Sequence, residues 1–120
     1  VDLVKTMKAH GKRTNLEVVS LSEEEGLAGA KIAVDAGFDV LMGTVYYDSI
    51  RDYLAGTGVK YYPFCGKVYG HPSVLDGSIE EIVAHAKELE AMFSPCEPDP
   101  QVELMKRLIA EAARISMQTV

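Results

Sequence analysis

The sequence predicts an α/β fold in which parallel strands alternate with helices. Three short runs of β-forming residues are separated by helical patterns, which is typical of parallel strands joined by right-handed crossovers. The chain has 120 residues and 48% of them are hydrophobic, so we expect a packed core rather than a disordered chain. It is therefore expected to be a compact α/β domain or a piece of something larger.

The expected strands are rich in apolar and β-forming residues. Asn15–Leu21 reads NLEVVSL, Asp39–Val45 reads DVLMGTV and Val59–Cys65 reads VKYYPFC. Short apolar runs of this kind are typical of strands buried in a parallel sheet. We expect three parallel strands, and the sequence leaves open whether their order is 1-2-3, as in a barrel, or 2-1-3, as in a flavodoxin-like sheet.

Helix boundaries are marked by capping residues and glycines. Ser22 with Glu25, and Ser78 with Glu81, have the spacing of a capping box, in which a hydroxyl and a carboxylate bond to free backbone N–H groups. Gly37 follows the second expected helix, at a position typical of a helix end. We expect helices at residues 2–10, 22–36, 48–55 and 78–92.

The last part of the chain has a different composition. The segment from Ser94 to Pro100 contains three prolines among its seven residues, which excludes a helix or a central strand there. Beyond it, apolar residues recur every three or four positions from Leu104 to Ile115, which predicts an amphipathic helix. The expected organisation is an α/β domain at 1–93, a proline-rich linker at 94–100 and a helix at 101–120 that packs on the domain or on a partner.

Charge and composition exclude several classes of function. The net charge of −6 argues against a surface that follows nucleic-acid phosphates, and no apolar run approaches the roughly 18 residues that span a bilayer. We therefore expect neither a nucleic-acid nor a membrane partner. Cys65 and Cys96 show no CxxC spacing, so neither a zinc site nor a disulfide framework is indicated. A cytoplasmic location is expected.

The connection between the third strand and the next helix, Gly66–Gly77, is the first candidate site. Its twelve residues exceed the usual two to six, and it follows the carboxyl end of a strand, where parallel α/β folds bind ligands. Lys67 and Ser73 are candidate substrate-binding residues, able to hold a phosphate or carboxylate, and His71 is a candidate catalytic residue. The alternative is an ordered loop whose polar groups face solvent.

Glu17 is the second candidate, because a carboxylate within a strand is costly to bury unless it is paired. In a closed barrel it would face the lumen and the active site, whereas on an edge strand it would lie in solvent. Thr44 and Tyr46, which end and follow the second strand, are expected to line the same pocket. Glu17 is therefore a candidate acid/base or metal-holding carboxylate. No metal or cofactor motif is present. The sequence therefore identifies no cofactor, and Mg²⁺ is a candidate only as a metal that Glu17 would help to hold.

Two strings of the chain, one from His10 to Glu17 (HGKRTNLE) and one from Gly29 to Gly43 (GAKIAVDAGFDVLMG), share features with a known fold family. They resemble the middle of phosphate-binding (β/α)8, or TIM, barrels. The pattern is a Gly-Lys before a strand, a helix that ends in D-A-G-x-D, and another strand. It is similar to the ribulose-phosphate-binding superfamily, which includes hexulose-phosphate synthases and keto-gulonate-phosphate decarboxylases. Glycerol-operon antiterminator-like barrels and keto-acid-phosphate aldolases show the same pattern.

The resemblance covers about residues 1–92 and implies a partial TIM-barrel-like segment that supplies roughly strands three to five of eight. A small flavodoxin-like three-layer sheet is the alternative. In the decarboxylase and synthase group an acidic residue lies in the strand after the first glycine, and Glu17 falls there. The Asp-x-Lys-x-x-Asp motif and the carboxyl-terminal Gly-Gly phosphate site of that group are absent.

These observations together predict a lyase- or isomerase-type barrel enzyme, or a segment of one. Its expected substrate is a small anionic molecule, a phosphorylated keto acid or sugar. A homo-oligomer is expected, because a three-stranded fragment of a barrel leaves strand edges exposed. The alternatives are a non-catalytic anion-sensing or assembly module and an inactive barrel fragment. A buried Glu17 facing a pocket would favour catalysis, and a solvent-facing one would favour binding or a structural role.

Overall fold

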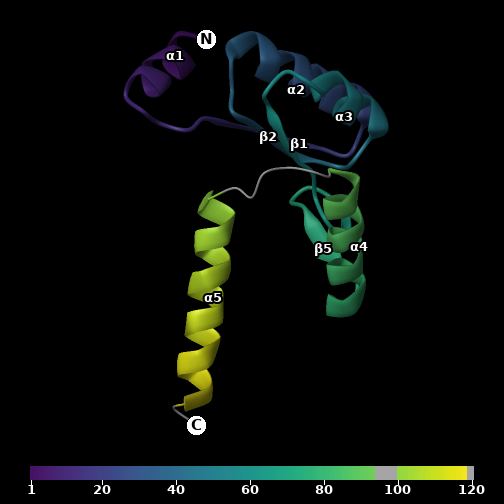
Figure 1. Ribbon diagram of the computed structural model, residues 1–120. Helices are drawn as coiled ribbons and strands as arrows, with labels where there is room; N and C mark the ends of the chain where they lie inside the picture. Colours follow the sequence, from purple (N-terminus) through teal and green to yellow (C-terminus); the bar gives the residue numbers. More distant parts are fainter. Residues whose placement is uncertain (94–99, 119–120) are drawn as a thin grey trace. The chain divides into compact units, whose positions relative to one another are not determined.

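The computed structural model, which describes residues 1–93 and 100–118, is a mixed α/β structure (Figure 1). Helices alternate with the strands of a three-stranded parallel sheet, which confirms the predicted fold class, and a two-stranded sheet follows. In chain order the elements are α1 (Asp2–Ala9), β1 (Asn15–Ser20), α2 (Glu23–Ala36), β2 (Val40–Thr44), α3 (Asp48–Leu54), β3 (Lys60–Tyr62), β4 (Lys67–Tyr69), β5 (Val74–Asp76), α4 (Ile79–Met92) and α5 (Pro100–Gln118).

The chain divides into two compact units, residues 1–87 and residues 88–120, and the division falls inside α4. The first unit contains both sheets. The predicted linker at 94–100 lies outside the described residues except for Pro100, which begins α5. The predicted boundary near residue 93 stays a prediction.

The parallel sheet has the strand order β1-β2-β3. Leu16 pairs with Leu41, and Leu41 pairs with Tyr61, so these three side chains lie side by side on one face. Sequential order of this kind differs from the 2-1-3 order of the flavodoxin-like alternative. The strand order that the sequence leaves open is therefore 1-2-3.

Both crossover helices, α2 and α3, lie on the same face of this sheet, as Figure 1 shows. Two glycines bring α2 close to its neighbours. A Cβ atom on Gly29 would lie 2.6 Å from Cγ2 of Val18, and one on Gly26 would lie 2.6 Å from Cδ1 of Ile50. Any larger residue at either position would push the helix away from β1 or α3. Between the sheet and these two helices lie Ala30, Ala33, Leu41, Ile50, Leu54 and Tyr61, all buried.

The buried face of α2 consists of small residues only. Ala30 and Ala33 are fully buried, but Ile32 is 56% exposed. Gly26 and Gly29 occupy the remaining buried positions. The close approach of the helix to the sheet admits only small residues, so the larger apolar side chains of α2 lie at its margins or in solvent.

The predicted helix caps are confirmed, one of them with an added residue. At α4, Ser78 Oγ accepts from Glu81 N at 3.2 Å and the Glu81 carboxylate accepts from Ser78 N at 2.7 Å, a complete capping box. At α2, Ser22 Oγ accepts from Glu25 N at 3.2 Å. The second bond of the capping box, between the Ser22 N–H and the Glu25 carboxylate, is made through Ser20. The Ser20 hydroxyl accepts from Ser22 N at 3.1 Å and donates to the Glu25 carboxylate at 2.5 Å. Ser20 therefore ties the end of β1 to the start of α2.

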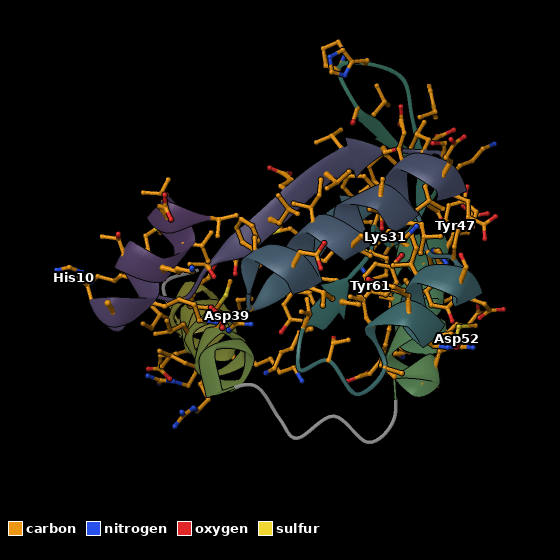
Figure 2. All side chains as sticks on the ribbon, turned by 90° about the horizontal axis from the view of Figure 1, so that it is seen from above. His10, Lys31, Asp39, Tyr47, Asp52 and Tyr61 are labelled. Carbon is orange, nitrogen blue, oxygen red and sulfur yellow. The ribbon has the colours of Figure 1, made fainter. Side chains whose placement is uncertain are left out.

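Asp39, the last residue of the D-A-G-x-D string, joins three elements at the amino edge of the sheet. Its Oδ2 accepts from the backbone N–H of Thr14 at 2.8 Å and from the hydroxyl of Thr14 at 3.0 Å. Its Oδ1 pairs with Nζ of Lys8 at 2.9 Å, and the same Nζ donates to the carbonyl of Gly37 at 2.8 Å. Figure 2 labels Asp39 at the end of the sheet near α1, away from Tyr47. The string is thus a structural clamp, not a ligand-binding motif.

The prediction of a loop at Gly66–Gly77 is wrong, because this segment forms an antiparallel hairpin. Lys67 pairs with Asp76, and Tyr69 pairs with Val74. Each arm has only three residues, too short to stand out as a strand in the sequence. The parallel strand before it also ends earlier than expected, at Tyr62, because the next residue is a proline and has no N–H for the ladder.

Replacing Asp39 tests the clamp. In Asp39→Ala, the N–H and hydroxyl of Thr14, which is 2% exposed, lose their acceptor, and we expect the free energy of unfolding to fall by about 1–3 kcal/mol. Lys8→Met removes only a partly exposed ion pair and should cost less than about 1 kcal/mol. Urea unfolding followed by circular dichroism measures both. Equal costs for the two variants would contradict the clamp.

The same clamp predicts a pH dependence. The hydrogen bond from Lys8, and then that from the Thr14 N–H, lower the pKa of Asp39 below its ordinary value of 3.8. Its stabilising effect is therefore complete above that value and is lost as the pH falls through the lower pKa of the folded state. The stability difference between the wild type and Asp39→Asn should shrink below about pH 4. A difference that is constant from pH 6 to the acid limit would argue that Asp39 makes no charge-dependent contact.

Candidate functional site

The predicted catalytic carboxylate lies on the face of the parallel sheet opposite α2 and α3. The register places Glu17 beside Met42 and Met42 beside Tyr62, so the three side chains form one row across that face. Glu17 is exposed, Met42 is half-buried, and Tyr62 is 39% exposed. Val19, 52% exposed, shares this side of β1 with Glu17. We call Glu17, Val19, Met42 and Tyr62 the open face.

Gly43 shapes the sheet next to Glu17. It has a φ of +86°, and a Cβ atom on it would lie 2.9 Å from Cγ of Glu17 and 3.1 Å from the carbonyl oxygen of Val18. The register between β1 and β2 shifts here by one residue, so that Ser20 pairs with Thr44. This irregularity turns Thr44 away from the open face and toward α2. Only glycine fits without strain at this position.

Thr44 therefore does not line a pocket with Glu17. It is fully buried, and its hydroxyl lies 2.9 Å from the hydroxyl of Tyr61, which donates in turn to the carbonyl of Val45 at 2.9 Å. Burial is the main reason that the pKa of Tyr61 is raised, so its phenol stays protonated and donates. The predicted binding residue Thr44 is thus part of a satisfied hydrogen-bond chain in the core.

Tyr46 lies beside the same chain. Its ring stacks on Tyr61, with ring centroids 6.1 Å apart and an angle of 21° between the planes. Its hydroxyl donates to Asp48 at 2.8 Å and accepts from Arg51 at 2.8 Å. Burial, and then the bond to Asp48, raise the pKa of Tyr46, so this phenol is also a donor and not a base. The structure brings Thr44 and Tyr46 together but places them on the helix-covered side, apart from the row that contains Glu17.

Arg51 is a site residue that the sequence analysis misses. Its guanidinium pairs with Asp48 at 2.8 Å and with Asp52 at 2.7 Å, and it donates to Tyr46. A signal for it exists, because Asp48 and Arg51 stand three residues apart at the expected start of a helix. This cation is neutralised by two carboxylates, so it is poorly suited to hold an anionic substrate.

The three candidate residues of the hairpin, Lys67, His71 and Ser73, are all exposed. Lys67 begins β4, opposite Asp76, whereas His71 and Ser73 lie in the turn beyond Tyr69. At about 3.4 Å per residue, the base of the hairpin is at least about 7 Å from its turn. The three residues predicted to bind the anionic group are therefore spread along the hairpin, and only His71 and Ser73 lie close together.

His85 on α4 holds the base of the hairpin, a role that no feature of the sequence indicates. Its Nδ1 accepts from the backbone N–H of Gly66 at 2.8 Å. Gly66 has a φ of +81°, and a Cβ atom on it would lie 2.6 Å from Leu75 and 3.1 Å from Ile82. The imidazole thus anchors the start of the hairpin on α4 and has a structural role.

Within residues 1–93 and 100–118, no group of three or more His, Cys, Asp or Glu side chains is placed to hold a metal ion. The described residues therefore do not form a protein cage for Mg²⁺, which prefers several oxygen ligands in octahedral geometry. Glu17 can act as a single carboxylate, as a general acid/base or as one ligand of a metal that a substrate also binds.

A comparison with known proteins found no matching family model, no matching curated protein and no matching solved structure. Among the helices that the structure describes, none is long and apolar enough to cross a membrane.

Gly43→Ala tests the irregularity that separates Glu17 from Thr44. The left-handed backbone and the close contacts should together lower the free energy of unfolding by about 1–3 kcal/mol. Gly56→Ala is the matched control, because Gly56 also has a positive φ, +75°, but nothing lies within 4 Å of its Cβ position. Denaturant unfolding of both variants separates backbone strain from the contact.

A double-mutant cycle completes this test. Glu17→Ala removes the Cγ atom that a Cβ on residue 43 would meet at 2.9 Å, so Gly43→Ala should cost less in that background. Strict additivity of the two changes would show that Glu17 does not lie over Gly43.

Proposed function

We propose that this chain forms part of the wall of a barrel-type lyase or isomerase that acts on a small anionic keto acid or sugar. The observation that supports the proposal most is the winding of the sheet. Three parallel strands stand in sequential order, and both crossover helices lie on one face. In (β/α)8 barrels the helices form the outer ring and the other face of the sheet lines the interior.

Glu17 is the catalytic residue in this proposal. It stands on the open face, in the row with Met42 and Tyr62. A carboxylate in this position is suited to take a proton from a carbon next to a carbonyl or from a hydroxyl of the substrate.

The hairpin is the proposed source of contacts with the anionic group. His71 and Ser73 can reach one phosphate or carboxylate together, and Lys67 adds positive charge at the base of the hairpin. Thr44 and Tyr46 hold the end of β2 and do not contact the substrate. A phosphorylated substrate, a homo-oligomer and a cytoplasmic setting complete the proposal. The cytoplasmic setting is proposed because the chain has only two cysteines, whereas small secreted domains are often rich in disulfides.

A second candidate function is a non-catalytic binding or assembly module. Glu17 is exposed, which is the placement expected for binding or a structural role rather than for catalysis. Val19 and Tyr62 expose 52% and 39% of their surface on the same face. Apolar side chains next to an exposed carboxylate are as suited to a protein contact as to a substrate. This candidate needs no acid/base role for Glu17.

A thermal-shift experiment distinguishes the two. The full chain is melted with sugar phosphates, keto acids and inorganic phosphate, each with and without Mg²⁺. A ligand at 100 times its Kd should stabilise the chain by about 2.7 kcal/mol, which raises Tm by several degrees. Glu17→Gln should lower that shift, because it removes the charge and keeps the shape. Glu24→Gln, an equal change on the exposed first turn of α2, should leave it unchanged.

The outcomes decide between the candidates. A phosphorylated hit that Glu17→Gln weakens and Glu24→Gln does not supports the enzyme. A hit that is indifferent to Glu17, but weakened by His71→Ala, supports anion binding without catalysis at Glu17. A cooperative melt with no shift for any of these compounds would contradict the enzyme proposal.

A further inference from the structure

The hairpin formed by β4 and β5 depends on α4 for its position. Its arms have three residues each and every residue of β5 is exposed, so the hairpin buries little apolar surface of its own. A two-stranded hairpin is at best marginally stable in water without a supporting surface. The support comes from α4 (Figure 1), because Gly66, at the base of the hairpin, lies against both Leu75 of β5 and Ile82 of α4.

The backbone N–H of Gly66 determines which form of the His85 imidazole fits here. An N–H group can only donate, so Nδ1 of His85, 2.8 Å away, has to accept the hydrogen bond. A neutral imidazole with its proton on Nε2 accepts at Nδ1, whereas a protonated imidazole donates from both nitrogens. Protonation of His85 therefore removes the bond and sets two N–H groups against each other.

His10 makes the opposite kind of contact. Its Nδ1 lies 2.8 Å from the carbonyl oxygen of Thr6, which can only accept, so His10 donates and keeps this bond when it is protonated. His71, the third histidine, is exposed in the turn of the hairpin. Among the histidines, all of which the structure describes, His85 is therefore the one whose Nδ1 contact is lost on protonation.

The charges next to His85 do not change this conclusion. The titratable groups come from α4 and from the base of the hairpin: Glu81, Glu88, Cys65, Lys67 and Asp76. The two glutamates lie about one turn from His85 on α4, and their carboxylates favour the protonated imidazole. Lys67 opposes it, and Asp76 stands opposite Lys67 in the hairpin ladder. These charges shift the pH at which the bond is lost, but not the form of the imidazole that makes it.

We propose that His85 is a pH-dependent anchor, which holds the hairpin on α4 while its imidazole is neutral and releases it when the imidazole is protonated. Histidine is the side chain that ordinarily changes its charge between about pH 5 and 8. Lys67, His71 and Ser73 all belong to the hairpin, so their position changes with the anchor. His85 and the hairpin both lie in the first unit, and the anchor needs no ligand, so the proposal stands independently of the proposed function.

Nuclear magnetic resonance of the full chain measures the bond and the anchor separately. Between about pH 8 and about pH 5.5, the amide proton of Gly66 should move upfield with the same midpoint as the ring protons of His85. Nuclear Overhauser contacts between the α protons of Gly66 and Ile82 should weaken over the same range, because a Cβ atom on Gly66 would lie 3.1 Å from Ile82. Contacts within the parallel sheet should persist, since the pKa of Asp39 is lowered from 3.8 and its clamp stays intact.

Hydrogen exchange gives the size of the effect. After correction for the intrinsic pH dependence of exchange, the protection of the Gly66 amide should fall by about threefold to tenfold across this range, the loss expected for one hydrogen bond. The amide of Gly56, in a turn that no histidine contacts in the structure, is the internal reference.

Three variants separate the acceptor from the charge. The side-chain oxygen of asparagine lies close to the position of Nδ1 and does not titrate, so His85→Asn should keep the Gly66 amide bonded throughout. His71→Asn, the same change in the exposed turn, should leave the pH dependence as in the wild type. His85→Phe keeps a ring but has no acceptor, and it should show the released hairpin already at about pH 8. Circular dichroism shows whether each variant keeps its fold.

Each result bears on the proposal. A Gly66 amide that follows the titration of His85, together with loss of the Gly66–Ile82 contact and a pH-independent His85→Asn, supports it. A Gly66 amide that does not move while His85 titrates, a His85 that stays neutral throughout, or a Gly66–Ile82 contact that persists after His85 is protonated overturns it. These three results come from the wild type, so the test does not depend on the folding of any variant.

Discussion

The carboxylate of Asp39 is the contact on which the arrangement of the first unit depends. One oxygen holds the backbone and the hydroxyl of Thr14, just before β1, and the other holds Lys8 at the end of α1. Because Asp39 itself immediately precedes β2, this single side chain sets the distance between the two strands at their amino ends. Gly37, with a φ of 77°, ends α2 two residues earlier and directs the chain toward that position. The D-A-G-x-D string thus has a physical meaning: a glycine ends the helix and an aspartate aligns the next strand with the previous one.

Strands aligned in this way form a sheet whose two faces have different roles. On one face, Gly26 and Gly29 let α2 approach so closely that alanines and Ile50 complete the core. On the other face, Glu17 stands in a row with apolar side chains that are only partly buried. Gly43 keeps these two roles apart, because its positive φ sends Thr44 into the core and leaves room for Glu17. A single-sided sheet of this kind is complete only when something covers its second face. That requirement is shared by the barrel proposal and by the assembly alternative.

The fold was more predictable from the sequence than the site. Helix ends follow local rules, so Ser78 with Glu81 and Gly37 were located from spacing alone. The hairpin was missed because its arms of three residues show no alternation that can be recognised. The contact of Thr44 with Tyr61 and that of His85 with Gly66 join residues 17 and 19 positions apart, and no local pattern encodes them. Glu17 stands out in the sequence as a carboxylate within an apolar strand, but whether it faces solvent or a pocket depends on what covers the sheet.

Three parallel strands stand in the order β1-β2-β3, with Glu17 on the face that α2 and α3 leave open. Nuclear Overhauser contacts between backbone protons of an isotope-labelled chain test this order directly. We expect contacts between β1 and β2 in the register that pairs Glu17 with Met42, contacts between β2 and β3 that pair Met42 with Tyr62, and none between β1 and β3. Contacts between β1 and β3, or methyl contacts from α2 to the Glu17 side chain, would contradict it.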